Sequence, residues 1–203
     1  MRLLRIEPAG RGRYLLHFED GRTRKVYENA LINRCLKPGA EISEEELGEM
    51  LRESAQEKAR IRGAAMTGKR AYSKRELREK LEAKGESPEA AAEAADWLEK
   101  LGAVNDAEYA GAIVNRYSGR GYGERRLREE LRRRGVPREL WEEALNGAQA
   151  PEESVDKLIA QKLRGKQPDR KELGKVTEAL LRRGFAWEEI AAGLRRYGED
   201  VTD

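Results

Sequence analysis

The sequence predicts a mainly α-helical repeat protein with a small β-hairpin or meander at its N-terminus. The main observation is one phrase that occurs three times at intervals of about fifty residues: YSKRELREKLEAKG at 72–85, YGERRLREELRRRG at 122–135 and GKVTEALLRRG at 174–184. Each copy has apolar residues at helical spacing and ends at a glycine, which suits a helix C-terminus. Such periodicity is typical of repeat architectures, so we expect more than two-thirds helix and strands only before about residue 28.

The composition favours solvated helices. Charged residues make up 39% of the 203 residues, well above the usual ~25%. No apolar run approaches the ~18 residues of a membrane span, and the N-terminus lacks the core of a signal peptide. The single cysteine, Cys35, excludes an internal disulfide and a cysteine zinc cluster. We therefore expect a cytoplasmic protein.

Positive and negative charges alternate along the chain, although the net charge is only +3. Lys and Arg outnumber Asp and Glu by ten to three over 58–84, by nine to three over 116–138 and by eight to three over 161–183. The segments between these three are acidic. Two interpretations stay open: neutralisation between helices packed in one repeat, or a functional basic surface.

The first forty residues predict a small β-structure. Residues 2–7, 13–18 and 23–27 are rich in residues that favour strands, and Asp20-Gly21 is a strong hairpin turn signal. Such a sheet is too small to be stable alone, so it should pack on helices. His17 lies in it, and we interpret this residue as structural because nothing nearby could orient it as a base.

Two helices should follow. Glu28 to Leu36 predicts a short helix in which Cys35 is a small core residue. Ser43 and Glu46 have the spacing of a capping box, which opens a long helix to about Gly68. We therefore expect one part at 1–40, with the β-hairpin and the short helix, and a long connecting helix at 41–70.

The rest of the chain predicts three-helix repeats at 71–118, 119–166 and 167–203, the last truncated or atypical. In the first repeat, helices should begin after Ser73, Ser87 and Asn105 or Asp106, which are residues that cap helix N-termini. The other predicted helices span 124–134, 137–145, 152–163, 170–183 and 187–197. A linker is expected at 165–168.

We expect no catalytic residues, no metal site and no cofactor. The chain has one histidine and one cysteine, which rules out the usual nucleophile–base and metal-ligand constellations. The glycine-rich segment 119–123 lacks the preceding strand and the Lys-Ser/Thr pair of a phosphate-binding loop. The basic residues are therefore the main candidates for function.

Six arginines on the repeated basic helices are candidates for binding a filament or DNA: Arg75, Arg78, Arg125, Arg128, Arg132 and Arg133. Guanidinium groups bind phosphate and carboxylate in a bidentate way. The competing interpretation is an intrahelical ion pair, since a glutamate follows Arg75 and Arg125 by four residues. On a helical wheel Arg125, Arg128 and Arg132 lie opposite the apolar stripe, so they should be exposed.

A helix-turn-helix reader of DNA sequence is a poor alternative. The helices that would enter the major groove are acidic: ESPEAAAEAADWLEK, VPRELWEEAL and AWEEIAAGL. DNA phosphates would repel them. We therefore expect DNA binding to be weak and independent of sequence.

Four phrases in order, YSKRELREKLEAKG, WLEKLGAVNDAEYA, GYGERRLREELRRRGV and LLRRGFAWEEI, resemble the RecX family of bacterial recombination regulators. The resemblance covers about residues 40–197. It implies tandem three-helix repeats in an elongated, curved array. It also implies a non-enzymatic, monomeric protein that lies in the groove of the RecA–DNA filament and inhibits RecA's ATPase, strand-exchange and coprotease activities. The alternative is a stand-alone helical repeat protein that binds nucleic acid without sequence preference.

Overall fold

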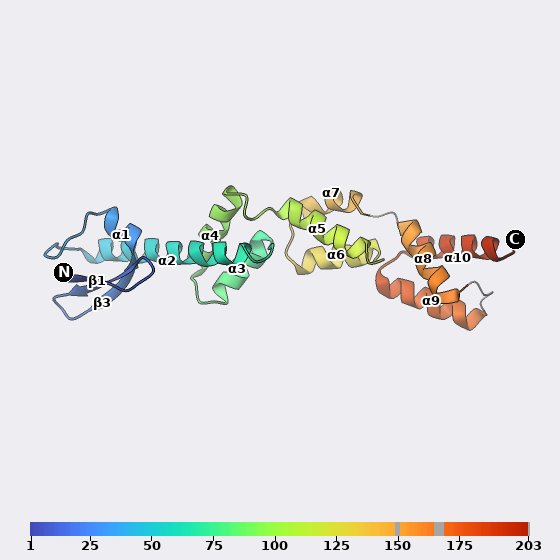
Figure 1. Ribbon diagram of the computed structural model, residues 1–203, viewed down its shortest axis with the longest axis horizontal. Helices are drawn as coiled ribbons and strands as arrows, with labels where there is room; N and C mark the ends of the chain where they lie inside the picture. The colour runs from blue at the N-terminus through green and yellow to red at the C-terminus, as the bar shows by residue number, and fades with distance from the viewer. Residues whose placement is uncertain (149–150, 165–168, 203) are drawn as a thin grey trace. The chain divides into compact units, whose positions relative to one another are not determined.

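A computed structural model of the chain describes residues 1–148, 151–164 and 169–202 (Figure 1). Helices make up 63% of the chain, slightly less than the two-thirds predicted. The described strands end at Tyr27, as expected, and beyond them one isolated bridge joins Glu41 to Arg2. The chain divides into two compact units, Met1–Val104 and Asn105–Asp203, which are described separately.

The first unit opens with a three-stranded antiparallel meander of β1 (Leu3–Pro8), β2 (Arg13–Phe18) and β3 (Thr23–Tyr27). Gly21 has a φ of 80°, as the turn between β2 and β3 requires. One face of the sheet is apolar and contributes four fully buried side chains to a core shared with the next two helices: Leu3, Leu16, Phe18 and Val26. The predicted meander is confirmed.

Helix α1 (Glu28–Ile32) is shorter than predicted, and Cys35 lies outside it. The prediction that Cys35 is a core residue is wrong: the residue has a left-handed φ of 49° and is exposed. Helix α2 (Glu44–Thr67) begins at the predicted capping box. The Ser43 hydroxyl accepts from the Glu46 amide at 3.0 Å, and the Glu46 carboxylate accepts from the Ser43 amide at 2.8 Å.

The C-terminal half of α2 packs with α3 (Lys74–Glu82) and α4 (Pro88–Lys100) around one core. Small residues allow α2 and α4 to approach closely. A Cβ added at Gly63 would lie 2.7 Å from Leu98 Cδ1. Both α3 and α4 begin at the predicted serine caps.

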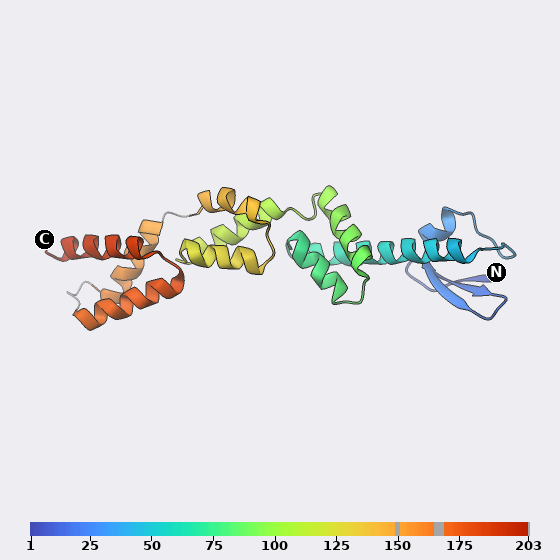
Figure 2. The same ribbon diagram turned by 180° about the vertical axis from the view of Figure 1, so that it is seen from behind.

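The second unit contains two further three-helix cores (Figure 2). The first is formed by α5 (Asp106–Ser118), α6 (Glu124–Arg133) and α7 (Trp141–Asn146), with the short 3-10 helix η1 (Arg138–Leu140) before α7. The second is formed by α8 (Pro151–Leu163), α9 (Arg170–Arg183) and α10 (Trp187–Thr202). Helix α10 continues past the predicted end at 197, and the linker expected at 165–168 lies outside the described residues.

The cores group the helices in threes, but not with the limits read from the sequence repeat. Helix α5 shares its core with α6 and α7, whereas the sequence segment 71–118 placed it with α3 and α4. Each basic helix shares a core with the helix before it, because the apolar faces of the two helices meet. The predicted limits at 71–118, 119–166 and 167–203 therefore do not coincide with the cores. That they are the limits of domains stays a prediction, as does the curvature of the array.

Candidate interaction surface on the basic helices

The arginines of α3 lie on its solvent side. Arg75 and Arg78 have 52% and 53% of their side chains exposed. Arg75 Nε lies 3.4 Å from Glu79 Oε1, and Arg78 Nε lies 3.4 Å from Glu82 Oε1. The pairing predicted for Arg75 is thus present, but exposed pairs with this spacing contribute only about 0.3–0.5 kcal/mol. A binding partner could therefore replace these two ion pairs at little cost in free energy.

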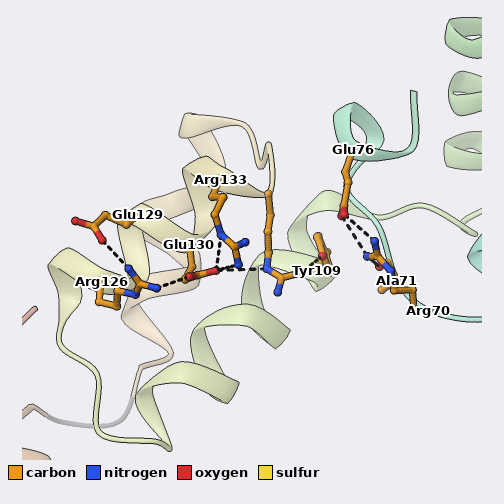
Figure 3. Close-up of polar contacts among 9 residues, drawn as sticks. Arg70, Ala71, Glu76, Tyr109, Arg126, Glu129, Glu130 and Arg133 are labelled. Carbon is orange, nitrogen blue, oxygen red and sulfur yellow. Dashed lines mark hydrogen bonds and ion pairs between the residues drawn. The ribbon is translucent and has the colours of Figure 1, made fainter. Parts of the chain in front are cut away.

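Other cations near the start of α3 hold the fold together. Lys74 Nζ lies 2.7 Å from both Asp96 Oδ1 and Glu99 Oε2 on α4. The hydrogen bonds that Lys74 donates, first to Asp96 and then to Glu99, raise the pKa of Lys74. Arg70 donates to both carboxylate oxygens of Glu76, at 2.7 and 3.3 Å (Figure 3). The contacts of Lys74 with α4 agree with the interpretation in which charges neutralise one another between packed helices.

In α6, Arg128 is held by two carboxylates. Its Nε donates to Glu124 at 2.7 Å, and its two terminal nitrogens donate to both oxygens of Glu142 on α7, at 2.9 and 3.2 Å. These hydrogen bonds raise the pKa of Arg128 and lower that of Glu142. The side chain is 37% exposed and the residue is half-buried, whereas the helical wheel predicted an exposed Arg128.

Arg125 is exposed, as predicted, but its head group reaches another helix. Its Nη2 donates to the carbonyl of Leu181 on α9 at 2.7 Å. The predicted pairing with Glu129 is taken over by Arg126, whose Nη1 lies 3.1 Å from Glu129 Oε2. Arg125 therefore joins α6 to the last turn of α9.

The backbones of α6 and α9 meet at two glycines. The Gly123 amide donates to the Arg183 carbonyl at 3.0 Å, and the Arg125 amide donates to the Gly184 carbonyl at 3.2 Å. A Cβ at Gly123 would lie 2.5 Å from backbone atoms of Gly184, and one at Gly184 would lie 2.5 Å from the Arg126 amide nitrogen. Backbone amides at the start of α6, which have no acceptor within their own helix, thus donate to carbonyls at the end of α9, which have no donor within theirs. The positive end of the α6 dipole therefore meets the negative end of the α9 dipole.

A buried carboxylate, which the sequence analysis did not single out, organises the other arginines of α6. Glu130 is 1% exposed and accepts from Arg126 Nη2 at 2.9 Å and from Arg133 Nη2 at 2.6 Å (Figure 3). Arg134 Nε lies 3.7 Å away, and Arg134 Nη1 donates to the Tyr109 hydroxyl on α5 at 2.8 Å. Burial raises the pKa of Glu130, but hydrogen bonds and charges led by Arg133 outweigh it and hold the pKa below its ordinary value.

The sequence contains a signal for the group of arginines around Glu130. Arginines stand four residues before Glu130 and three and four residues after it, which are the positions that meet on one helix face. Arg133 is 65% exposed although it binds Glu130, and Arg132 is exposed on the same helix. The six predicted arginines therefore divide: Arg125 and Arg128 join helices, Arg133 clamps a buried carboxylate, and Arg75, Arg78 and Arg132 present exposed side chains.

Small-molecule and metal chemistry find little support in the described residues. In 1–148, 151–164 and 169–202, no group of three or more His, Cys, Asp or Glu residues is placed to hold a metal ion. A pocket beside Tyr122 and Leu127 has a volume of about 120 Å³, and another beside Leu163 and Val176 has about 240 Å³, both below the ~300–1,000 Å³ of typical ligand sites. None of the described helices is long and apolar enough to cross a membrane.

Comparison with known proteins identifies the middle three helices. Residues 105–145, which cover α5 to α7, match the family model described as RecX, second three-helix domain. Regulatory protein RecX of Deinococcus radiodurans is 38% identical over 135 residues, which cover 65% of this chain and 64% of that protein, just under two thirds of its length. Regulatory protein RecX of Xanthomonas axonopodis pv. citri is 33% identical over 141 residues, which cover 68% of this chain and 87% of that protein.

The fold agrees with these matches. A crystal structure of a regulatory protein RecX superposes with a TM-score of 0.73 and covers 93% of this chain and 96% of its own. Its sequence identity is 23%, so this likeness supports the fold alone. The sequence matches include a relative that is 33% identical and is covered over 87% of its length. The chain therefore belongs to the RecX family.

Proposed function

We propose that the protein is a non-enzymatic regulator of the RecA recombinase. It binds the RecA–single-stranded DNA filament in its helical groove and inhibits RecA's ATPase, strand-exchange and coprotease activities. Membership in the RecX family is the observation that carries the proposal, because the relatives bear the name of regulatory proteins. We further propose that it acts in the cytoplasm as a monomer.

In this proposal the exposed arginines contact the filament. Arg75 and Arg78 on α3 and Arg132 and Arg133 on α6 offer guanidinium groups to an acidic protein groove or to DNA phosphates. Arg125 and Arg128 act indirectly, because their hydrogen bonds fix the position of α6. Exposed cations also speed association with an anionic filament, and salt screens this effect.

The test measures RecA's DNA-dependent ATPase on filaments assembled before the protein is added. A filament binder should inhibit when far less protein is present than is needed to coat the DNA. The matched control is an unrelated ATPase that also depends on single-stranded DNA, and it should keep its rate. If both enzymes slow in parallel, and only when the DNA is coated, the protein competes for DNA and the RecA proposal fails.

That failure would favour the second candidate, a stand-alone helical protein that binds nucleic acid without sequence preference. The acidic helices that follow α3 and α6 make base-specific reading unfavourable. Affinities for unrelated DNA sequences should then be similar and should fall steeply with salt. A strong preference for one duplex would contradict both candidates.

A further inference from the structure

The sheet in the first unit has an outer face that the core does not use. Side chains alternate along each strand, and the inner set packs into the core. The register aligns Arg5 with His17 and Thr23, and Glu7 with Leu15 and Lys25. The outer sheet face consists of the residues that alternate with the buried ones: Arg5, Glu7, Arg13, Leu15, His17, Thr23, Lys25 and Tyr27.

This face is basic. Arg5, Arg13 and Lys25 contribute three cations against one carboxylate, that of Glu7. The Arg5 side chain is 65% exposed, and Lys25 is also exposed. Arg5 Nη2 lies 3.1 Å from Glu7 Oε2, a surface pair of small value. The outer sheet face therefore presents an excess of positive charge to solvent.

The loop between β1 and β2 adds a fourth cation. Gly10, Arg11 and Gly12 have consecutive positive φ values of 75°, 54° and 67°. The left-handed conformation costs a residue with a side chain roughly 1–2 kcal/mol, so Arg11 is held at the loop tip against its preference. Arg13 Nε donates to the Gly10 carbonyl at 3.0 Å and braces the loop. Such strain is often found where a side chain is presented to a partner.

Between the cations the face carries rings and an apolar side chain. His17 is held in place, because its ring nitrogens lie 3.1 Å from Glu7 Oε2 and 3.3 Å from Thr23 Oγ1. Leu15 and Tyr27 are half-buried farther along the same face, where Tyr27 lies opposite Arg13. Open sheets that combine cations with rings and apolar groups suit single strands, whose phosphates pair with cations while the bases stack on flat side chains.

We propose that the outer sheet face binds single-stranded DNA, with Arg5, Arg11 and Lys25 placed on phosphates. Strand spacing puts Arg5 and Lys25 roughly 12 Å apart, which a few nucleotides span. A protein partner is less well matched, since the face lacks a continuous apolar centre of the kind that anchors interfaces. The inference deepens the DNA-binding part of the proposed function by naming its site, and it does not depend on RecA.

The test uses the full chain and a labelled oligodeoxythymidylate of about twenty nucleotides, with affinity measured by fluorescence anisotropy. The variant Arg5→Gln/Arg11→Asn/Lys25→Gln removes three cations, and asparagine tolerates the left-handed conformation at residue 11. The matched control Lys84→Gln/Lys100→Gln/Lys157→Gln removes three exposed cations elsewhere.

Loss of three phosphate contacts should make the slope of log affinity against log salt less negative by about 2. At about 50 mM salt the sheet variant should bind at least tenfold more weakly than wild type, and the control within about twofold. If the sheet variant melts early, Arg5→Gln with Lys25→Gln replaces it, with an expected slope change of about 1.4. Equal affinity and slope for sheet variant and control would overturn the inference.

The RecA assay separates this inference from the proposed function. A sheet variant that still binds DNA but no longer inhibits RecA would assign the face to a protein partner and would overturn the inference. A wild-type protein that does not inhibit RecA, while its DNA binding depends on the sheet cations, would refute the proposed function and support the inference.

Discussion

Helices α3 and α6 have similar sequences but use their arginines differently. Both bury two leucines and turn a basic side to solvent. In α3, Arg75 and Arg78 project from the surface beside exposed glutamates of their own helix. In α6, Arg125 and Arg128 bind α9 and α7. A repeated phrase thus specifies the same helix and core, while the neighbouring helices decide what its charges do.

Two pairs of residues, each fifty positions apart in the sequence, differ between the helices. Ser73 caps α3 with its hydroxyl, which accepts from the Glu76 amide at 3.0 Å. Its counterpart Gly123 has no side chain, and the end of α9 takes its place. Similarly, Lys80 is exposed on α3, whereas its counterpart Glu130 is buried under three arginines. Helix α3 is capped locally, and α6 is anchored by contacts distant in sequence.

The largest effect should come from the shared core. Leu77→Ala with Leu81→Ala, and Leu127→Ala with Leu131→Ala, remove side chains that are at most 2% exposed. Each pair should lower the free energy of unfolding by about 5 kcal/mol or more through lost burial and cavities. Denaturant melts of the two double variants check this. If one pair proved nearly neutral, the two helices would not have equivalent core roles.

The two helix starts should lose different amounts of stability when their residues are exchanged. Gly123→Ser introduces a better capping residue, yet its Cβ would collide with backbone of Gly184, so we expect a loss of about 1–3 kcal/mol. Ser73→Gly should cost below about 1 kcal/mol, because glycine is an acceptable N-cap. Thermal melts measure both. A stabilised Gly123→Ser protein would show that α6 does not depend on its contact with α9.

The counterparts Glu130 and Lys80 provide the next comparison. Glu130→Gln removes the charge that binds Arg126 and Arg133, and should cost about 2 kcal/mol, less than a fully buried pair because the arginines are partly exposed. Lys80→Gln should change stability by less than about 0.5 kcal/mol. A cost for Lys80→Gln as large as that for Glu130→Gln would contradict the account.

Acid should affect the same two variants differently. The pKa of Glu130 is lowered in the folded protein. Its stabilising contribution is therefore complete above the unfolded pKa of about 4.3 and is lost as pH falls through the folded value. Wild type and Lys80→Gln should lose this contribution in acid, and Glu130→Gln should lack it throughout. Melts between neutral pH and acid, in which the difference between wild type and Glu130→Gln narrows, would show this.

Much of the fold could be predicted from the sequence, because its signals are local. The capping box at Ser43, the cap at Ser73 and the alternating strands before residue 28 all act within a few residues, and the structure confirms them. The sequence placed Cys35 in a longer helix, but the chain leaves the helix after Ile32. The periodicity did not show that each basic helix shares a core with the helix before it. A repeat in the sequence gives the spacing of similar helices, but it does not say at which helix a packed group of three begins.

The candidate site was harder to predict because its contacts span long distances in sequence. Arg125 reaches a carbonyl 56 residues away, and no pattern within α6 announces that contact. The sequence analysis did not single out Glu130, although the arginines around it were a usable signal. Its burial depends on packing against α5, where Tyr109 binds Arg134.

Substitution of the α3 arginines that we propose as filament contacts should have only a small effect on stability. Arg75→Gln with Arg78→Gln removes exposed side chains and two surface pairs, so stability should fall by less than about 1 kcal/mol. Arg125→Gln with Arg128→Gln removes the interhelical bonds to Leu181 and Glu142 and should cost about 1–3 kcal/mol. The two variants lose the same charge from matching positions.

A melting curve paired with inhibition of the RecA ATPase, for these two variants and wild type, tests the central claim that matched arginines serve binding in α3 and architecture in α6. We predict that the Arg75/Arg78 variant melts like wild type and needs at least tenfold more protein for half inhibition. The Arg125/Arg128 variant should melt earlier and, at temperatures where it is folded, inhibit more nearly like wild type. An Arg75/Arg78 variant that inhibits as well as wild type would contradict the claim.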